Sequence, residues 1–193
     1  DWFFGQLFVR FGRANVVIAL TADHGVTPLP EWSRAHGHPD ARRVAVDSII
    51  LDVNAQLGRR TTPAEWLILD TGMLLVPGRE TLAAAGVNVD SVMDDVAARL
   101  RPVPGVARVE RPTDVSRGDT AADPVARRWQ HEIPPDAGVA LVVTLRPYAI
   151  WSDARSGAAQ HGQPSDFDTH VPLVLWGQRI RSGTYPGRVG EVD

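Results

Sequence analysis

Two short motifs, each with a histidine followed by a glycine, lie next to apolar stretches of this sequence. Asp23-His24-Gly25 follows an apolar stretch, and His161-Gly162 precedes another. A carboxylate beside an imidazole is a donor pair that suits zinc better than calcium or magnesium, because zinc accepts mixed oxygen and nitrogen ligands. Asp23, His24 and His161 are therefore candidate metal ligands. The alternatives are that Asp23 caps the following turn beside an incidental histidine, and that His161 is an ordinary solvated loop residue.

Other titratable residues are weaker candidates. Asp168 and His170 lie between His161 and the last apolar stretch. We expect them to support that loop, or to contact a metal ligand without binding the metal themselves. The alternative is an ordinary surface pair. His36 and His38 could bind a metal in principle, but histidines next to proline and glycine are more often simply exposed. His131 lies in a polar segment and is given no role.

Composition excludes several classes of function. The chain has 193 residues, a formal net charge of −3, no cysteine and 44% hydrophobic residues, which is enough for a core without disulfides. Its 20 basic residues are all arginine and alternate with 23 acidic ones, so no basic stripe predicts nucleic-acid binding by bulk charge. Chemistry that needs lysine or cysteine is excluded, and no apolar run approaches the ~20 residues of a membrane span.

The elements that must position the candidate residues are predicted to be strands that alternate with helices. Continuous apolar runs predict buried strands at 16–20, 139–145 and 171–176. Helical patterns are expected at 1–11, 44–57 and 90–100, two short strands within 66–76, another strand at 106–109, and loops at 111–124, 132–138 and 152–166. We therefore predict an α/β fold with a mostly parallel sheet covered by helices on both faces. Asp23 and His24 then lie at the carboxyl end of a strand, where such sheets bind ligands.

The two motifs together resemble those of a known family. The segment Leu20-Thr21-Ala22-Asp23-His24-Gly25-Val26, with Pro28-Leu29-Pro30-Glu31 after it, resembles a metal-binding segment of the alkaline phosphatase superfamily. The segment from His161-Gly162-Gln163-Pro164 to Asp168-Thr169-His170-Val171-Pro172-Leu173 resembles the last metal-ligand motif of the type I phosphodiesterase/nucleotide pyrophosphatase-like branch, which includes bacterial alkaline phosphatases. The second match makes the first specific, because sulfatases and phosphoglycerate mutases share Asp-His-Gly.

This resemblance implies a zinc-dependent phosphoric ester hydrolase. Asp23 and His24 would bind one zinc and His161 the other, in a two-metal phosphoryl transfer from a small phosphate ester. The fold implied is the three-layer sandwich of that superfamily, here incomplete at its N-terminus, with residues 60–150 partly an inserted or peripheral segment. A periplasmic or secreted location is implied by the family alone.

The rest of the family's pattern is not found in the sequence. The Thr or Ser nucleophile and the earlier metal ligands precede the Asp-His-Gly segment in the family, so we expect this chain to be the C-terminal portion of one catalytic domain, inactive by itself and prone to self-association. Two alternatives remain open. One is a sulfatase or phosphomutase of the same superfamily, and the other is a non-catalytic binding domain whose Asp23-His24 pair is structural.

Overall fold

The computed structural model describes residues 2–58, 66–134, 136–152, 159–187 and 189–190. The chain divides into two compact units. The first comprises residues 1–23 and 171–193, and the second comprises residues 24–170.

The described residues of the first unit form one α-helix, a short 3-10 helix and a pair of short strands. Its elements are α1 (Trp2–Phe11), the 3-10 helix η1 (Arg13–Asn15), β1 (Ile18–Leu20) and β8 (Val174–Trp176). The strands pair antiparallel, with Ile18 opposite Trp176, and the ring of Phe8 lies 5.1 Å from that of Trp176. The predicted helix is thus confirmed, because its apolar residues recur at helical spacing.

The prediction that both of these strands are buried is wrong for the chain as described. Leu20 is 59% exposed and Leu175 is 51% exposed, and no residue of α1 is buried. An unbroken apolar run indicates a strand suited to burial on both faces, but burial also needs layers of structure to cover it. Within this unit β1 and β8 have only each other and one helix.

The second unit is built on a four-stranded sheet in the order β3-β4-β6-β5. Its strands are β3 (Ile68–Asp70), β4 (Met73–Leu75), β5 (Val106–Glu110) and β6 (Val139–Leu145), and all neighbouring pairs are antiparallel. The expectation of a mostly parallel sheet is therefore wrong for the described strands. A second pair, β2 (Arg42–Val44) and β7 (Ala149–Trp151), is parallel. The α/β class itself is confirmed.

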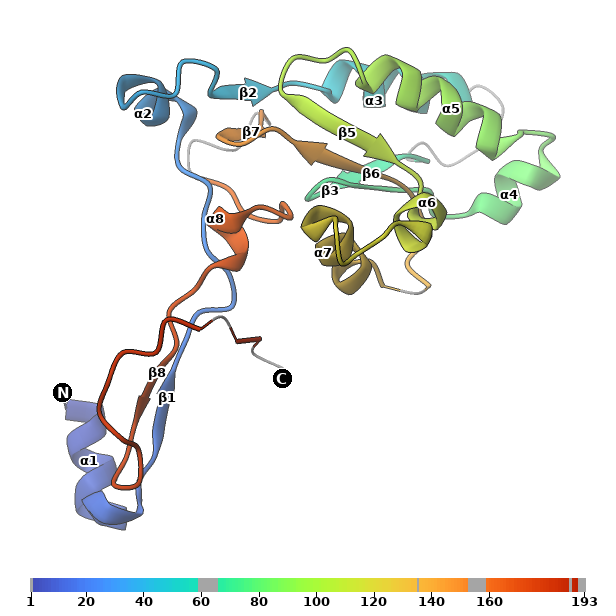
Figure 1. The fold of residues 1–193 in the computed structure, drawn as a ribbon. Helices are drawn as coiled ribbons and strands as arrows, with labels where there is room; N and C mark the ends of the chain where they lie inside the picture. Colours follow the sequence, from blue (N-terminus) through green and yellow to red (C-terminus); the bar gives the residue numbers. More distant parts are fainter. Residues whose placement is uncertain (1, 59–65, 135, 153–158, 188, 191–193) are drawn as a thin grey trace. The chain divides into compact units, whose positions relative to one another are not determined.

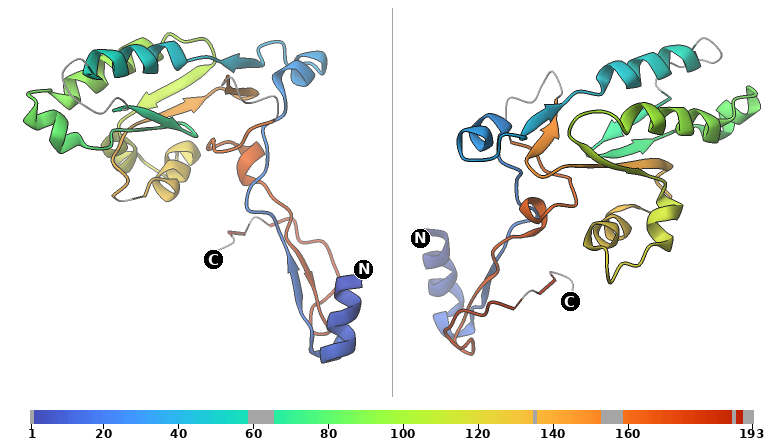
Figure 2. Two further views of the ribbon diagram at one scale, coloured as in Figure 1. Left: turned by 180° about the vertical axis from the view of Figure 1, so that it is seen from behind. Right: turned by 45° about the horizontal axis from the view of Figure 1, so that its top comes forward.

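Helices cover both faces of this sheet (Figures 1 and 2). One face carries α3 (Asp47–Gly58) and α5 (Val89–Leu100), and the other carries α6 (Pro112–Arg117) and α7 (Pro124–Glu132). The central strand β6 contributes side chains to both helix layers, because successive side chains of a strand point to opposite faces. Leu141 and Val143 pack in the core with α3 and α5, whereas Val142 packs with Trp129 of α7.

Three further helices lie in the described part of the second unit. They are α2 (Pro30–Ala35), α4 (Arg79–Ala84) and α8 (Asp166–Thr169). The predicted strands at 106–109 and 139–145 and the predicted hairpin within 66–76 are confirmed, as are the helices within 44–57 and 90–100. The range 60–150 holds all four strands of the sheet, and its description as an insertion stays a prediction.

The loop predicted at 111–124 is wrong, because it contains α6 and the first residue of α7. Each of these two helices has proline in its first turn, where the missing N–H costs no hydrogen bond. Asp123 caps α7 by accepting hydrogen bonds from the backbone of Val125 and Ala126. Polar composition hid both helices, and the few apolar residues they contain are buried against the sheet.

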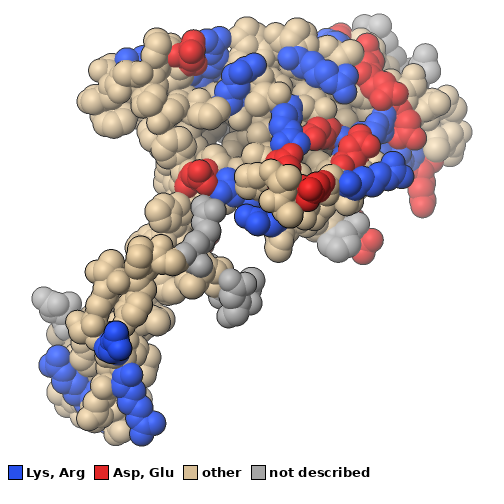
Figure 3. Space-filling view, viewed as in Figure 1, with Lys and Arg blue, Asp and Glu red and all other residues tan. Residues whose placement is uncertain are grey.

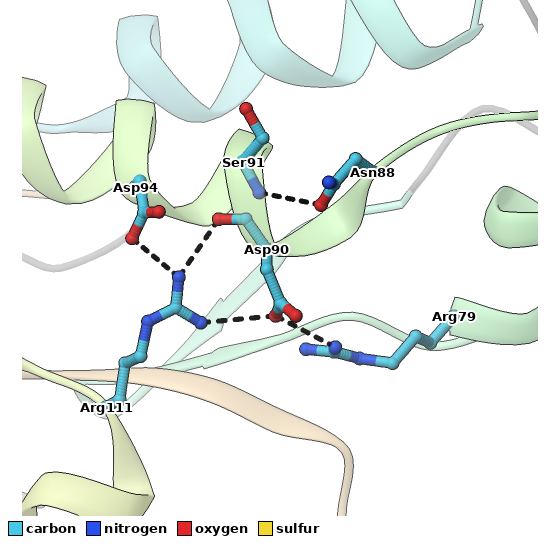
Figure 4. A network of polar contacts seen from close by, with 6 residues as sticks. All are labelled: Arg79, Asn88, Asp90, Ser91, Asp94 and Arg111. Atoms are coloured by element: carbon cyan, nitrogen blue, oxygen red, sulfur yellow. Dashed lines mark hydrogen bonds and ion pairs between the residues drawn. The ribbon is translucent and has the colours of Figure 1, made fainter.

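Charged side chains of both signs lie over the surface formed by α5, β5 and α6 (Figure 3). Arg111 donates hydrogen bonds to Asp94 at 2.6 Å and to the side chain of Asp90 at 3.2 Å, and Arg79 also contacts Asp90 (Figure 4). Asn88 caps α5 beside this network. The Arg79 guanidinium, with Arg111, lowers the pKa of the Asp90 carboxyl.

No helix in the described part of the chain has the length and hydrophobicity needed to span a bilayer.

Candidate metal site

The second unit brings the two histidine motifs together. The imidazole rings of His24 and His161 stack, with 3.7 Å between ring centroids and 16° between ring planes. The segments that carry them pair in an antiparallel bridge, in which Thr27 N–H donates to the carbonyl of Gln160 at 2.8 Å. The sequence predicts both histidines as candidates, but only the fold places one against the other.

One ring nitrogen of His24 already has a partner. Its Nδ1 lies 2.8 Å from the carbonyl oxygen of Gly25. Because a carbonyl can only accept, Nδ1 carries the proton in this hydrogen bond. Histidines that bind metals typically hold the other ring nitrogen in this way, since the hydrogen bond fixes the tautomer and the ring orientation. The ring of His24 is thus oriented by a hydrogen bond of the kind that metal-binding histidines make.

Both glycines of the motifs are required by close packing. A Cβ at Gly25 would lie 1.9 Å from the carbonyl oxygen of Phe167. Gly162 has φ +88°, a left-handed conformation that favours glycine, and a Cβ there would lie 2.6 Å from Cβ of Thr71. The close approach of the two segments therefore depends on the glycine that follows each histidine.

The other candidate site residues lie outside the pair of stacked histidines. Asp23 is an exposed residue of the first unit. Asp168 is buried, with only 6% of its surface exposed, and burial raises the pKa of its carboxyl. His170 is exposed at the C-terminal end of α8. His36 stacks on Trp32, with 4.0 Å between ring centroids, so it has a packing role on α2.

His38 and His131 also lie outside the pair of stacked histidines. The ring of His38 stacks on Tyr148, with 3.7 Å between ring centroids, and His131 is exposed near the end of α7. Among the described residues, no group of three or more His, Asp or Glu side chains is arranged to hold a metal ion. Two imidazoles fit zinc as part of a ligand set, and a zinc site needs at least three protein ligands.

Sequence reasoning missed the residue that anchors the second motif. The side chain of Gln163 is buried, accepts a hydrogen bond from Leu145 N–H at 2.8 Å and donates one to the carbonyl of Thr71 at 3.0 Å. Gln163 thereby fixes the His161 segment to β6 and to the turn between β3 and β4. A polar residue in a polar loop carries no periodic signal, so its burial could not be read from the sequence.

A cavity of about 370 Å³ lies beside His161. Its lining combines apolar walls with acidic and amide groups, and includes Leu69, Asp70, Trp151 and Gln160. Glu132, at the end of α7, has its pKa raised to about 7 by burial and by the carboxylates of Asp168 and Asp70. His161 therefore borders open space that acidic side chains also line.

Comparison with known proteins identifies relatives for almost the whole chain. No family model matches it. The chain is 24% identical over 187 residues to alkaline phosphatase PafA of Elizabethkingia meningoseptica, which covers 94% of this chain and 32% of that protein. It is 25% identical over 203 residues to alkaline phosphatase PhoK of a Sphingomonas species, which covers 98% of this chain and 36% of that protein. The chain thus spans about a third of the length of these relatives.

Solved structures agree on the fold. The crystal structure of wild-type PafA superimposes with a TM-score of 0.75 at 21% identity, over 94% of this chain and 34% of that one. A mutant of PafA gives a TM-score of 0.73 at 20% identity, over 91% of this chain and 32% of that one. Similarity in sequence and in fold over nearly its whole length thus supports a relationship of this chain to the alkaline phosphatase superfamily, at low sequence identity.

Proposed function

We propose that this chain supplies part of the zinc site of a phosphoric ester hydrolase. The observation that carries the proposal is the stacking of His24 on His161, because it joins the two motifs whose sequences resemble metal-ligand motifs of the superfamily. The named relatives are alkaline phosphatases. Asp23 and His24 would bind one zinc and His161 a second.

The residues of this chain would bind zinc and orient its ligands, while residues elsewhere in the protein would react with the phosphate ester. Bound zinc supplies charge stabilisation to the transferring phosphoryl group. The hydrogen bond from His24 to the Gly25 carbonyl orients the imidazole, and the cavity beside His161 offers room for the group attached to the phosphate. We place the Thr or Ser nucleophile and the other ligands in the two thirds of the relatives' length that this chain does not match.

The proposed substrates are phosphoric esters, either monoesters or diesters. A periplasmic or secreted location is likewise proposed from the family resemblance alone. A sulfatase or a phosphomutase of the same superfamily is distinguished from the proposed hydrolase by turnover of an aryl sulfate or of a phosphosugar in place of an aryl phosphate.

The test is the variant His161→Ala in the native protein. We expect it to lose about one zinc per chain by elemental analysis and to slow hydrolysis of an aryl phosphate by more than about 100-fold, the upper range for loss of a group that merely supports a ligand. His36→Ala is the matched control, because His36 is also an imidazole stacked on another ring. The 193-residue chain by itself should show no turnover. Unchanged zinc content and rate in His161→Ala would contradict the assignment.

A further inference from the structure

Asp168 joins the two segments that carry the stacked histidines. Its backbone carbonyl accepts a hydrogen bond from Gly25 N–H at 2.7 Å. Its carboxylate accepts one from the hydroxyl of Thr27 at 3.2 Å through Oδ1, and one from Gln163 N–H at 2.7 Å through Oδ2. One buried residue therefore holds three donors, two from the His24 segment and one from the His161 segment.

These donors lie next to the histidines along the chain. Gly25 directly follows His24, and Gln163 lies two residues after His161. The bridge between Thr27 and Gln160 provides a further connection between the same two segments. The separation of the two imidazoles is thus set by hydrogen bonds to the backbone immediately beside each ring.

The surroundings of Asp168 make its position well defined. It lies on the single-turn helix α8, where Ser165 caps the helix by accepting a hydrogen bond from Asp168 N–H. Gln163 in turn is tied to the β-sheet through Leu145 and Thr71. A side chain held at both carboxylate oxygens and at its own backbone transmits the rigidity of the sheet to the loops.

We propose that Asp168 is a positioning residue that fixes the spacing of His24 and His161, and that it acts through the backbone beside them without binding the metal itself. The consequence for zinc rests on the proposed function, whereas the consequence for the two rings does not. An asparagine at this position could keep both links, because its amide oxygen accepts from Gln163 N–H and its amide nitrogen donates to the Thr27 hydroxyl. Alanine could keep neither.

The experiment compares Asp168→Ala, Asp168→Asn and Thr27→Val in the native protein. In the metal-free protein, NMR should show a nuclear Overhauser contact between the two imidazole rings, retained in Asp168→Asn and lost in Asp168→Ala. Zinc affinity should fall by about 10- to 100-fold in Asp168→Ala and by less than about threefold in Asp168→Asn. Asp114→Ala, which removes an exposed carboxylate on α6, controls for loss of charge.

Each outcome decides the proposal. A folded Asp168→Ala protein that keeps the ring contact would overturn it, and so would an Asp168→Asn protein that is folded but has lost the contact. If Asp168→Ala does not fold, Thr27→Val decides: shifted resonances of the His24 and His161 rings support the proposal, and unchanged ones overturn it. Because the ring contact is measured without substrate or metal, failure of the proposed hydrolase activity leaves this test intact.

Discussion

At the scale of single residues, the candidate site depends on polar side chains that are held by hydrogen bonds within the protein. His24 has one ring nitrogen fixed by a carbonyl, and Asp168 is buried with its oxygens occupied. The motif could be recognised from the sequence because Asp, His and Gly occur side by side. The role of Gln163 could not, because its partners on β6 and in the turn before β4 are distant in the chain.

Glu132 gives a prediction at this scale. Its carboxyl has a pKa of about 7 in the folded protein, against about 4.3 in an unfolded chain. The folded state thus holds this proton more tightly, so the contribution to stability is complete below about pH 4.3 and is lost as the pH rises through 7.

We therefore expect Glu132→Gln to be more stable than the parent at pH 8, by on the order of 1 to 2 kcal/mol after allowance for partial exposure. At pH 4 the two proteins should differ much less. Urea denaturation followed by tryptophan fluorescence at both pH values measures this. Glu80→Gln, an exposed glutamate of α4, is the control. An equal effect of Glu132→Gln at the two pH values would rule the interpretation out.

At the scale of elements, sequence periodicity predicted the helices and strands that are long or have a strong apolar pattern. The strand at 139–145 was predicted, and the helices predicted at 44–57 and 90–100 are observed at 47–58 and 89–100, since each has enough apolar residues to define a face. The short helices α6 and α7 were missed, because their formation depends on proline at the start, on burial of one or two residues and, in α7, on a capping side chain. Trp129, fully buried with its indole N–H donating to Thr144, anchors α7 to the sheet.

The cap of α7 is testable through Asp123. Its carboxylate accepts hydrogen bonds from Val125 N–H at 3.0 Å and Ala126 N–H at 3.1 Å, and it pairs with Arg108 at 2.7 Å. The Arg108 hydrogen bond, followed by those from the backbone, lowers the pKa of Asp123 to about 2. This stabilisation is present above about pH 3.9 and is lost as the pH falls through 2.

Asp123→Ala should lower the free energy of unfolding at pH 7 by about 1 to 2 kcal/mol, the range for loss of a helix cap. Asp123→Asn keeps the capping oxygen and loses only the ion pair, so it should retain most of the stability. Thermal denaturation of the three proteins provides the comparison. If Asp123→Ala melts with the parent protein, the cap does not stabilise α7.

At the scale of the whole molecule, the first unit leaves many large apolar side chains exposed. Trp2, Val9 and Val17 are 77%, 85% and 69% exposed, and the paired strands β1 and β8 carry others. Exposed apolar surface of this kind favours association with another protein surface. We therefore expect the 193-residue chain to form oligomers through this unit.

The measurement is light scattering over a range of concentrations. Mass per particle should rise with concentration for the parent chain, and Leu20→Lys on β1 should reduce the rise, because a charge on an exposed strand opposes pairing with other chains. Leu51→Lys, at an exposed apolar position of α3 in the other unit, is the matched control and should leave the rise unchanged. A monodisperse monomer at all concentrations would contradict the expectation.

The sequence by itself determined the chemistry available to this protein and the family that it resembles. Two histidine-glycine motifs, an absence of lysine and cysteine, and a long apolar strand are local properties, and local properties are visible in residue order. Only the tertiary structure decided that His24 lies against His161, that Asp168 bonds to Thr27 from 141 positions away, and that the sheet is antiparallel. Such contacts depend on which distant segments bury one another, and no local spacing or periodicity encodes that choice.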